Sequence, residues 1–423
     1  MKFLHRSGHA FAEHAIGMTA FLALFPGFFF YHTALGLGSM GAFLGGYFAP
    51  VSVLFAGPLC FIYAYQVRHD RNQLTRSDLF FNLYIAYFLC VVAVNAIAGA
   101  NPHIVANHIL GVLFTVNLFI IFKFTDFGRR SFRIAAFASM VAMSAIVFAF
   151  SVDGSFYLAP LGAAKNPESL ATYQGFSRSY LLTFAVVIAY TRPMGLRVLL
   201  YCMAAPTLFV NTARSEFVAM LVMVPIVELY HARRKMLITF VFVALIFFIY
   251  VNLDTLLSLL PSSRILELLD LSHSTSANKR QHLSEYALHT IARYPVFGDY
   301  ASYPPGLYSH NVLSAWVDTG LFGFLFVLAL VIVPAIPMGI KGYFTANKHG
   351  EFLIGFSLGC ITLLLLITSH YFTDMFIGAT LGAYAKYRYG RTHAYRRPPE
   401  LRPSAPRHPY SHQGVPAPGA ARL

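Results

Sequence analysis

The residues best suited to chemistry lie in the segment 295–323, which begins with Pro295-Val-Phe-Gly298 and ends with Gly320-Leu-Phe-Gly323. Between these two motifs, Ser309-His310-Asn311 ends a polar loop and opens an apolar run. Histidine is the side chain that most readily gains or loses a proton near neutral pH. His310 therefore lies where a titratable group can meet both water and a lipid-borne substrate.

Two arginines share this setting. Arg214, in Asn211-Thr-Ala-Arg214-Ser-Glu216, lies where one apolar run ends and the next begins, so its charge joins the free N–H groups of a helix N-terminus. That combination predicts an anion site. Arg280 opens a predicted helix in the long loop that His310 closes. The structural alternatives are an arginine that reaches the membrane interface, paired with Glu216, and a histidine that caps a helix.

Three further polar residues are candidate substrate contacts. Asn311 and Asp318 lie about two turns apart on one face of a predicted helix, so Asp318 either orients a polar neighbour or is buried with a partner. Arg178 ends the connection 151–178, which is expected either to line a cleft or to be a plain loop.

The composition determines the class of protein. Of 423 residues, 57% are hydrophobic and 11% are charged, and the mean hydropathy is +0.60. This leaves too little polar surface to cover a soluble globule, so the sequence predicts an all-α polytopic membrane protein. The net charge of +14 does not indicate nucleic-acid binding, because most basic residues lie in short loops and a tail beside lipid headgroups. All four cysteines lie in apolar runs without CxxC spacing, which predicts small core residues rather than disulfides or zinc ligands.

Twelve apolar runs are candidate membrane-spanning helices that would position these residues. They cover about 15–37, 42–66, 78–99, 104–123, 133–150, 179–191, 196–211, 215–230, 236–253, 312–339, 352–371 and 372–386. An even number of spans leaves both termini on one side of the membrane. Alternate connections hold 24 of the 31 Lys and Arg residues, which makes that side the cytoplasm.

Seven basic residues remain on the opposite, external face: Lys165, Arg178, Arg214, Arg264, Lys279, Arg280 and Arg293. The orientation rule depletes this face of cations, so each needs a reason, and binding an anion is the clearest one. A solvated loop charge is the alternative, favoured for Lys165, Arg264 and Arg293.

Outside the spans, the external segment 254–311 contains an amphipathic pattern over 278–293, which predicts a helix on the membrane surface that stops at Tyr294-Pro295. Residues 1–390 form one predicted membrane domain. The Pro-, Arg- and His-rich residues 391–423 predict a disordered cytoplasmic tail. Sporadic histidine pairs such as His103 and His108 lack the spacing of a metal site, so neither metal nor cofactor is expected.

This arrangement resembles a known family. Twelve spans, an arginine at the outer start of a mid-chain span, and the ordered series Arg280…Tyr294-Pro-Val-Phe-Gly298…Ser309-His310-Asn311…Asp318-Thr-Gly320-Leu-Phe-Gly323 look like the bacterial O-antigen ligase and Wzy-type O-antigen polymerase superfamily. The motifs cover roughly residues 200–330. The chain departs from the family pattern at Tyr300, where members often carry a second glycine, and at Ala213-Arg214-Ser215, where they often carry Ser-Arg-Gly.

The resemblance implies a metal-independent, inverting glycosyltransferase of the GT-C type in the inner membrane, with its site facing the periplasm. The donor would be a glycan on undecaprenyl diphosphate. The acceptor would be a hydroxyl of lipid A–core for a ligase, or of a second lipid-linked repeat unit for a polymerase. On this interpretation Arg214 and Arg280 stabilise the departing diphosphate. His310 serves as the base, with Asn311 and Asp318 orienting it.

Two other classes compete with this interpretation. A flippase or exporter of lipid-linked sugars would also use cations in a cavity, but it is expected to place charged or broken helices near mid-membrane. A membrane scaffold without catalysis would not need His310.

Overall fold

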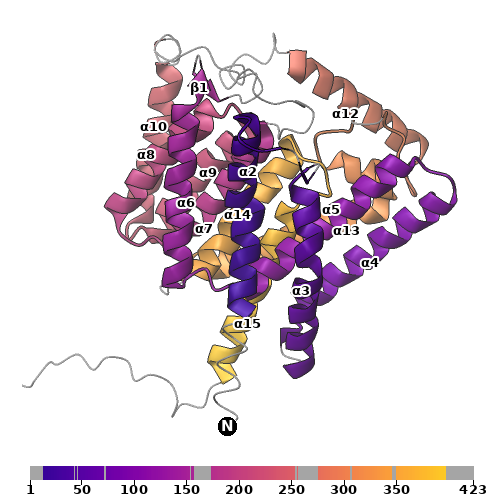
Figure 1. The fold of residues 1–423 in the computed structure, drawn as a ribbon, viewed down its shortest axis with the longest axis horizontal. Helices are drawn as coiled ribbons and strands as arrows, with labels where there is room; N and C mark the ends of the chain where they lie inside the picture. Colours follow the sequence, from indigo (N-terminus) through magenta and orange to yellow (C-terminus); the bar gives the residue numbers. More distant parts are fainter. Residues whose placement is uncertain are drawn as a thin grey trace, which may run out of the picture.

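The computed structural model describes residues 13–41, 43–44, 46–70, 73–152, 154–156, 173–252, 255, 275–304, 307–344 and 349–396. These residues form a bundle of helices with one small hairpin (Figure 1). The helices are η1 Ala23–Gly27, α2 Phe28–Gly36, α3 Phe48–His69, α4 Arg76–Ile97, α5 Pro102–Phe124, α6 Arg130–Ala149, α7 Tyr173–Ala189, α8 Met194–Val210, α9 Arg214–His231, α10 Lys235–Val251, α12 Thr275–Arg293, α13 Leu313–Pro337, η6 Met338–Gly342, α14 Gly350–Thr368 and α15 Phe376–Arg396. The hairpin pairs β1 Ser151–Val152 with β2 Ser155–Phe156.

The prediction of an all-α membrane protein is confirmed. Each of the twelve predicted runs contains a helix, and seven helices are long and apolar enough to cross a membrane by length and composition. These seven are Glu13–Gly36, Phe48–His69, Arg76–Ile97, Pro102–Phe124, Arg130–Ala149, Leu313–Ile340 and Gly350–Thr368. Two shorter apolar helices are α8 and α10. Twelve crossings therefore remain a prediction.

Three boundaries differ from the predicted ones. Gly175 to Arg178 belong to α7 rather than to a loop, because α7 already begins at Tyr173. A loop separates α14 from α15 where two spans were predicted to follow each other directly. Helix α15 continues to Arg396, past the predicted start of the tail. The rest of that tail and most of the loop 254–274 lie outside the described residues.

The bundle has a buried centre and an apolar outer surface. Helix α7 is buried along nearly its whole length, whereas no residue of α10 is buried. An apolar helix without buried residues is expected to face lipid. Cys60, Cys90 and Cys202 are also exposed, so the prediction that they are core residues is wrong. These three cysteines lie on the outer faces of their helices.

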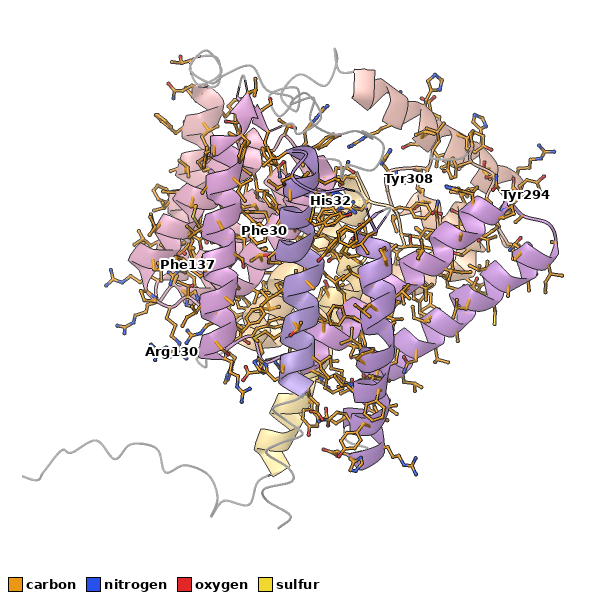
Figure 2. All side chains as sticks on the ribbon, viewed as in Figure 1. Phe30, His32, Arg130, Phe137, Tyr294 and Tyr308 are labelled. Carbon is orange, nitrogen blue, oxygen red and sulfur yellow. The ribbon has the colours of Figure 1, made fainter. Side chains whose placement is uncertain are left out.

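The two ends of the bundle differ in what they carry. The N-terminal end of α6, with Arg130, lies at one end, together with the C-terminal end of α15 (Figures 1 and 2). Helix α12, with Tyr294 just after it, and the hairpin lie toward the other end. The start of α6 and the end of α15, predicted to be cytoplasmic, thus lie away from α12 and the hairpin, which were predicted to be external.

The amphipathic pattern of the external segment correctly predicts α12, which ends just before Tyr294-Pro295. Its apolar face packs against protein: Ala287 is fully buried with Tyr303 and Val317. Leu288, on another face, is 56% exposed. The expected position of α12 on a membrane surface stays a prediction, and α13 is its main partner in the described residues.

The turn Pro295–Gly298 fits into a break in α13. At Gly320 the backbone leaves the helical conformation, with φ 70° and ψ −175°. The amide of Leu321 then donates to the carbonyl of Val296 over 3.1 Å. A Cβ atom on Gly298 or on Gly320 would collide with backbone atoms of the other segment, and both residues have positive φ. The Pro-x-x-Gly and Gly-Leu-x-Gly motifs are therefore two halves of one junction.

We expect Gly320→Ala to destabilise the protein strongly. A positive φ alone costs an alanine about 1–2 kcal/mol, and the backbone overlap with the 295–298 turn adds to this. Thermal unfolding in detergent micelles measures the effect. Gly57→Ala, with open space around it, serves as the neutral control, and Gly99→Ala, with φ 91° and nothing within 4 Å, isolates the cost of φ. If Gly320→Ala unfolds at the same temperature as Gly99→Ala, the junction is not tightly packed.

Candidate functional site

Four segments that are distant in sequence meet at one end of the bundle. They are the start of α9, the first turns of α12, the residues before α13, and the loop 369–375 between α14 and α15. The structure places Arg214, Arg280 and His310, three predicted site residues, in this region.

Arg214 and Arg280 repel each other electrostatically. Burial lowers the pKa of Arg280, and the like charge of Arg214 lowers it further. Arg214 is the first residue of α9, with Ala213 as the N-cap. Two guanidinium groups that repel each other near a helix N-terminus favour a bound anion, because an anion relieves their repulsion.

His310 is half-buried beside them. Its ring lies 4.5 Å from the ring of Tyr308, centroid to centroid, and hydrogen-bonds to the backbone of Ser369. Burial first, and then the charge of Arg280, lower the pKa of His310 to about 4. The imidazole is thus neutral at pH 7, and one ring nitrogen can take up a proton.

The hydrogen bonds described for Asn311 link α12 to α13 and do not reach the His310 ring. Its Oδ1 accepts hydrogen bonds from the Ser309 hydroxyl at 2.8 Å and from the amide of Leu313 at 3.0 Å. Its amide nitrogen donates to the Ser284 hydroxyl of α12 at 3.2 Å. Asn311 therefore binds the first residue of α13 and ties α12 to it, which fixes the backbone of the neighbouring His310.

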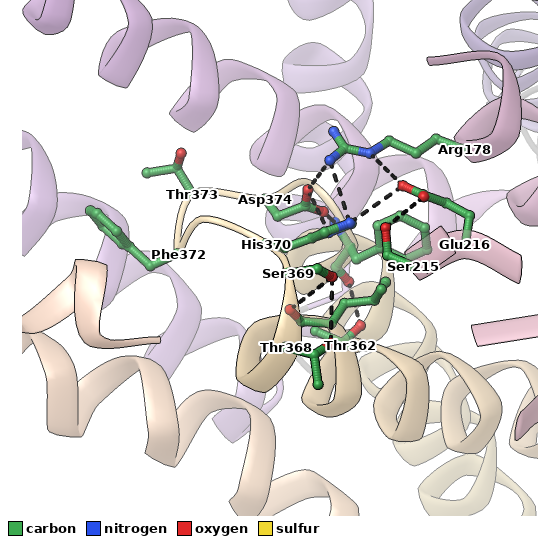
Figure 3. Close-up of polar contacts among 12 residues, drawn as sticks. Arg178, Ser215, Glu216, Thr362, Thr368, Ser369, His370, Phe372, Thr373 and Asp374 are labelled. Carbon is green, nitrogen blue, oxygen red and sulfur yellow. Dashed lines mark hydrogen bonds and ion pairs between the residues drawn. The ribbon is translucent and has the colours of Figure 1, made fainter. Parts of the chain in front are cut away.

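Arg178 takes part in a cluster of charged side chains (Figure 3). Its Nε lies 3.2 Å from Glu216 Oε1, and its Nη2 lies 3.4 Å from Asp374 Oδ2 and from His370 Nε2. We call Arg178, Glu216, His370 and Asp374 the ion cluster. Glu216, the predicted partner of Arg214, here lies against Arg178, which faces two carboxylates.

The loop 369–375 is the part of the site that sequence reasoning missed. His370 and Asp374 are buried, and His370 Nδ1 lies 2.9 Å from Asp374 Oδ2. The sequence did contain a signal for this loop. His370 and Asp374 lie four residues apart, where two apolar runs meet on the predicted external face. Tyr371 and Phe372 between them extended the apolar pattern and concealed the loop.

Asp318 is buried with partners, one of the two predicted alternatives. Its Oδ1 accepts from the amide of Ala301 at 2.9 Å, and its Oδ2 accepts from the Tyr371 hydroxyl. The Tyr371 oxygen lies 2.7 Å from His108 Nε2, and His108 Nδ1 lies 2.7 Å from the Tyr300 hydroxyl. Burial raises the pKa of Tyr371 well above its ordinary value, so this phenol stays protonated and donates.

These bonds form a directed chain. The Tyr371 hydroxyl donates its hydrogen bond to the Asp318 carboxylate, so the Tyr371 oxygen must accept from His108 Nε2–H. His108 Nδ1 is then the acceptor for the Tyr300 hydroxyl. His108 is thereby a neutral structural residue. Among the described residues no group of three or more His, Cys, Asp and Glu could hold a metal ion.

Comparisons with models of known protein families and with curated proteins find no match to this chain.

We expect Arg178→Met to lower stability far more than Arg280→Met. Removing Arg178 leaves the carboxylates of Glu216 and Asp374 buried without their guanidinium, a loss of about 3 kcal/mol. Arg280 makes no ion pair in the described part of the chain, so its loss relieves repulsion with Arg214. The unfolding midpoints of both variants in the same detergent provide the measurement. Equal midpoints would show that Arg178 does not have this structural role.

Proposed function

We propose that this protein is a glycosyltransferase of the O-antigen ligase and polymerase type. It moves a glycan from undecaprenyl diphosphate to a sugar hydroxyl of an acceptor. The observation that carries this proposal is the closeness of two arginines that repel each other and a histidine kept neutral beside them. A bound diphosphate and an acceptor hydroxyl are the two reactants that such a trio suits best.

The arginines would act on the leaving group. In the proposed step the acceptor oxygen bonds to the anomeric carbon with inversion, while the bond from that carbon to the phosphate oxygen breaks and leaves its electron pair on the diphosphate. Arg214 and Arg280 stabilise this growing negative charge, since a guanidinium matches phosphate oxygens with two parallel hydrogen bonds.

His310 would take the proton of the acceptor hydroxyl. Its neutral imidazole is held by the Ser369 backbone, and Asn311 fixes the start of the helix that follows. A positioned base of this kind supplies a factor of roughly 10² to 10⁴ in rate. The acceptor is lipid A–core in a ligase and a second lipid-linked repeat unit in a polymerase, and membrane lipids surround the helices in either case.

A flippase of lipid-linked sugars is the second candidate, because α13 is broken at Gly320 and carries the buried Asp318. Transporters often use broken helices and buried charges. Here the 295–298 turn fills the break, and Asp318 is occupied by Tyr371 and Ala301. Both features then serve the fold, which favours the transferase.

We place the site at the periplasmic face of the inner membrane and both termini in the cytoplasm. Single cysteines at His282 and at Arg130, in a variant without the four native cysteines, test this. The side chain of His282 is 89% exposed. A membrane-impermeant maleimide should label position 282 in intact cells and position 130 only after permeabilisation, because it cannot cross the bilayer. The reverse pattern contradicts the topology.

His310→Ala should lower the rate of glycan transfer by on the order of 10² to 10⁴, while the protein still folds and binds the lipid-linked donor. Purified protein in nanodiscs, given an undecaprenyl-diphosphate-linked glycan and an acceptor, provides the assay. Because the base must be neutral, wild-type kcat/KM, which reports the free protein, should fall on the acid side only near the His310 pKa of about 4. His289→Ala, on the exposed side of α12, is the control. A flippase would move donor equally well with alanine at 310, and near-normal transfer by that variant rules out the base.

A further inference from the structure

The loop 369–375 carries two neighbouring residues that face different partners. The backbone of Ser369 accepts a hydrogen bond from the His310 ring. The next residue, His370, is only 3% exposed and belongs to the ion cluster (Figure 3). Whatever holds His370 in place therefore also sets the position of the carbonyl that touches His310.

Both ring nitrogens of His370 face a carboxylate. Nδ1 lies 2.9 Å from Asp374 Oδ2, and Nε2 lies 3.4 Å from Glu216 Oε1. A neutral imidazole has one N–H group and can serve only one of them, whereas an imidazolium serves both. Arg178 Nη2, 3.4 Å from Nε2, is the contact that favours the unprotonated nitrogen.

Counting charge points the same way. Two buried carboxylates are balanced by one guanidinium and one imidazolium, which leaves the ion cluster neutral. With an uncharged His370 the cluster would hold a net negative charge among buried groups, which is costly.

We propose that His370 is a positioning residue of this site: as an imidazolium between Asp374 and Glu216, it holds the Ser369 carbonyl against the His310 ring. The inference rests on the proposed function. By accepting from one nitrogen of His310, Ser369 fixes the tautomer and leaves the other nitrogen for the acceptor hydroxyl. His370 itself touches no reacting atom.

The surrounding groups support this charge state. Burial opposes it, but the charge of Asp374 and hydrogen bonds to Asp374 and Glu216 outweigh burial and the repulsion of Arg178, so the pKa of His370 is raised above 6.5. These groups come from α7, α9 and the loop itself, and His310 faces His370 from the residues before α13. Because the folded pKa is raised, the proton stabilises the fold fully below pH 6.5, and this contribution is lost as the pH rises through the raised value.

The test measures kcat and KM for the lipid-linked donor against pH for the wild type, His370→Gln and His370→Lys. Wild-type kcat should fall at alkaline pH as His370 loses its proton. His370→Gln should lower kcat on the order of tenfold to a hundredfold, leave KM nearly unchanged, and lose the alkaline fall. His370→Lys keeps a charge to higher pH, so it should restore part of kcat and move the alkaline fall upward. His282→Gln is the exposed control.

A second measurement separates this proposal from the proposed function. The wild-type unfolding temperature should decrease as the pH rises above 6.5, and that decrease should be absent in His370→Gln. An absence of transfer by the wild type would refute the transferase while leaving this result valid. A pH-independent unfolding temperature, or His370→Gln with the wild-type kcat and alkaline fall, overturns the role of His370.

Discussion

The cost of burying charge governs this end of the molecule. Isolated ions in a low-dielectric interior are unstable, so buried cations need partners. Arg178 meets this requirement within the ion cluster, where Glu216 and Asp374 face it at 3.2 Å and 3.4 Å. Arg280 instead lies near the like charge of Arg214. Arg178 thus lies between two carboxylates that help to hold the fold, whereas Arg280 is repelled by Arg214, which a bound anion would relieve.

The break in α13 at Gly320 allows the charged segments to come together at this end of the bundle. A continuous helix through Gly320 would leave no space for the 295–298 turn, and the loop that follows the turn could not reach back to the bundle. With the turn in place, Ala301 donates to Asp318, and Tyr300 reaches His108 of α5. Tyr300 therefore has a defined partner in the structure. Gly298 and Gly320, both with positive φ, fix this junction.

The sequence predicted what depends on local pattern. Helical periodicity predicted α12. The position of Arg214 just before an apolar run predicted that it lies at the start of a helix, and it is the first residue of α9. The pairing of Arg178 with Asp374 could not be predicted, because it joins residues almost two hundred positions apart and no local pattern specifies such a contact. His370 was missed because Tyr371 and Phe372 continue the apolar pattern of the neighbouring runs, although Phe372 is buried and Tyr371 partly buried against protein.

The groups around His310 impose opposite demands, and substrate binding would reconcile them. Burial and the charge of Arg280, the arginine proposed to stabilise a departing diphosphate, lower the pKa of His310 to about 4, which would weaken it as a base. A diphosphate bound at Arg214 and Arg280 would offset their charge and raise the pKa of His310 again. The base would then be neutral in the free protein and strongest only once the donor is in place. Ser369, which accepts from the same ring, keeps it aimed in both states.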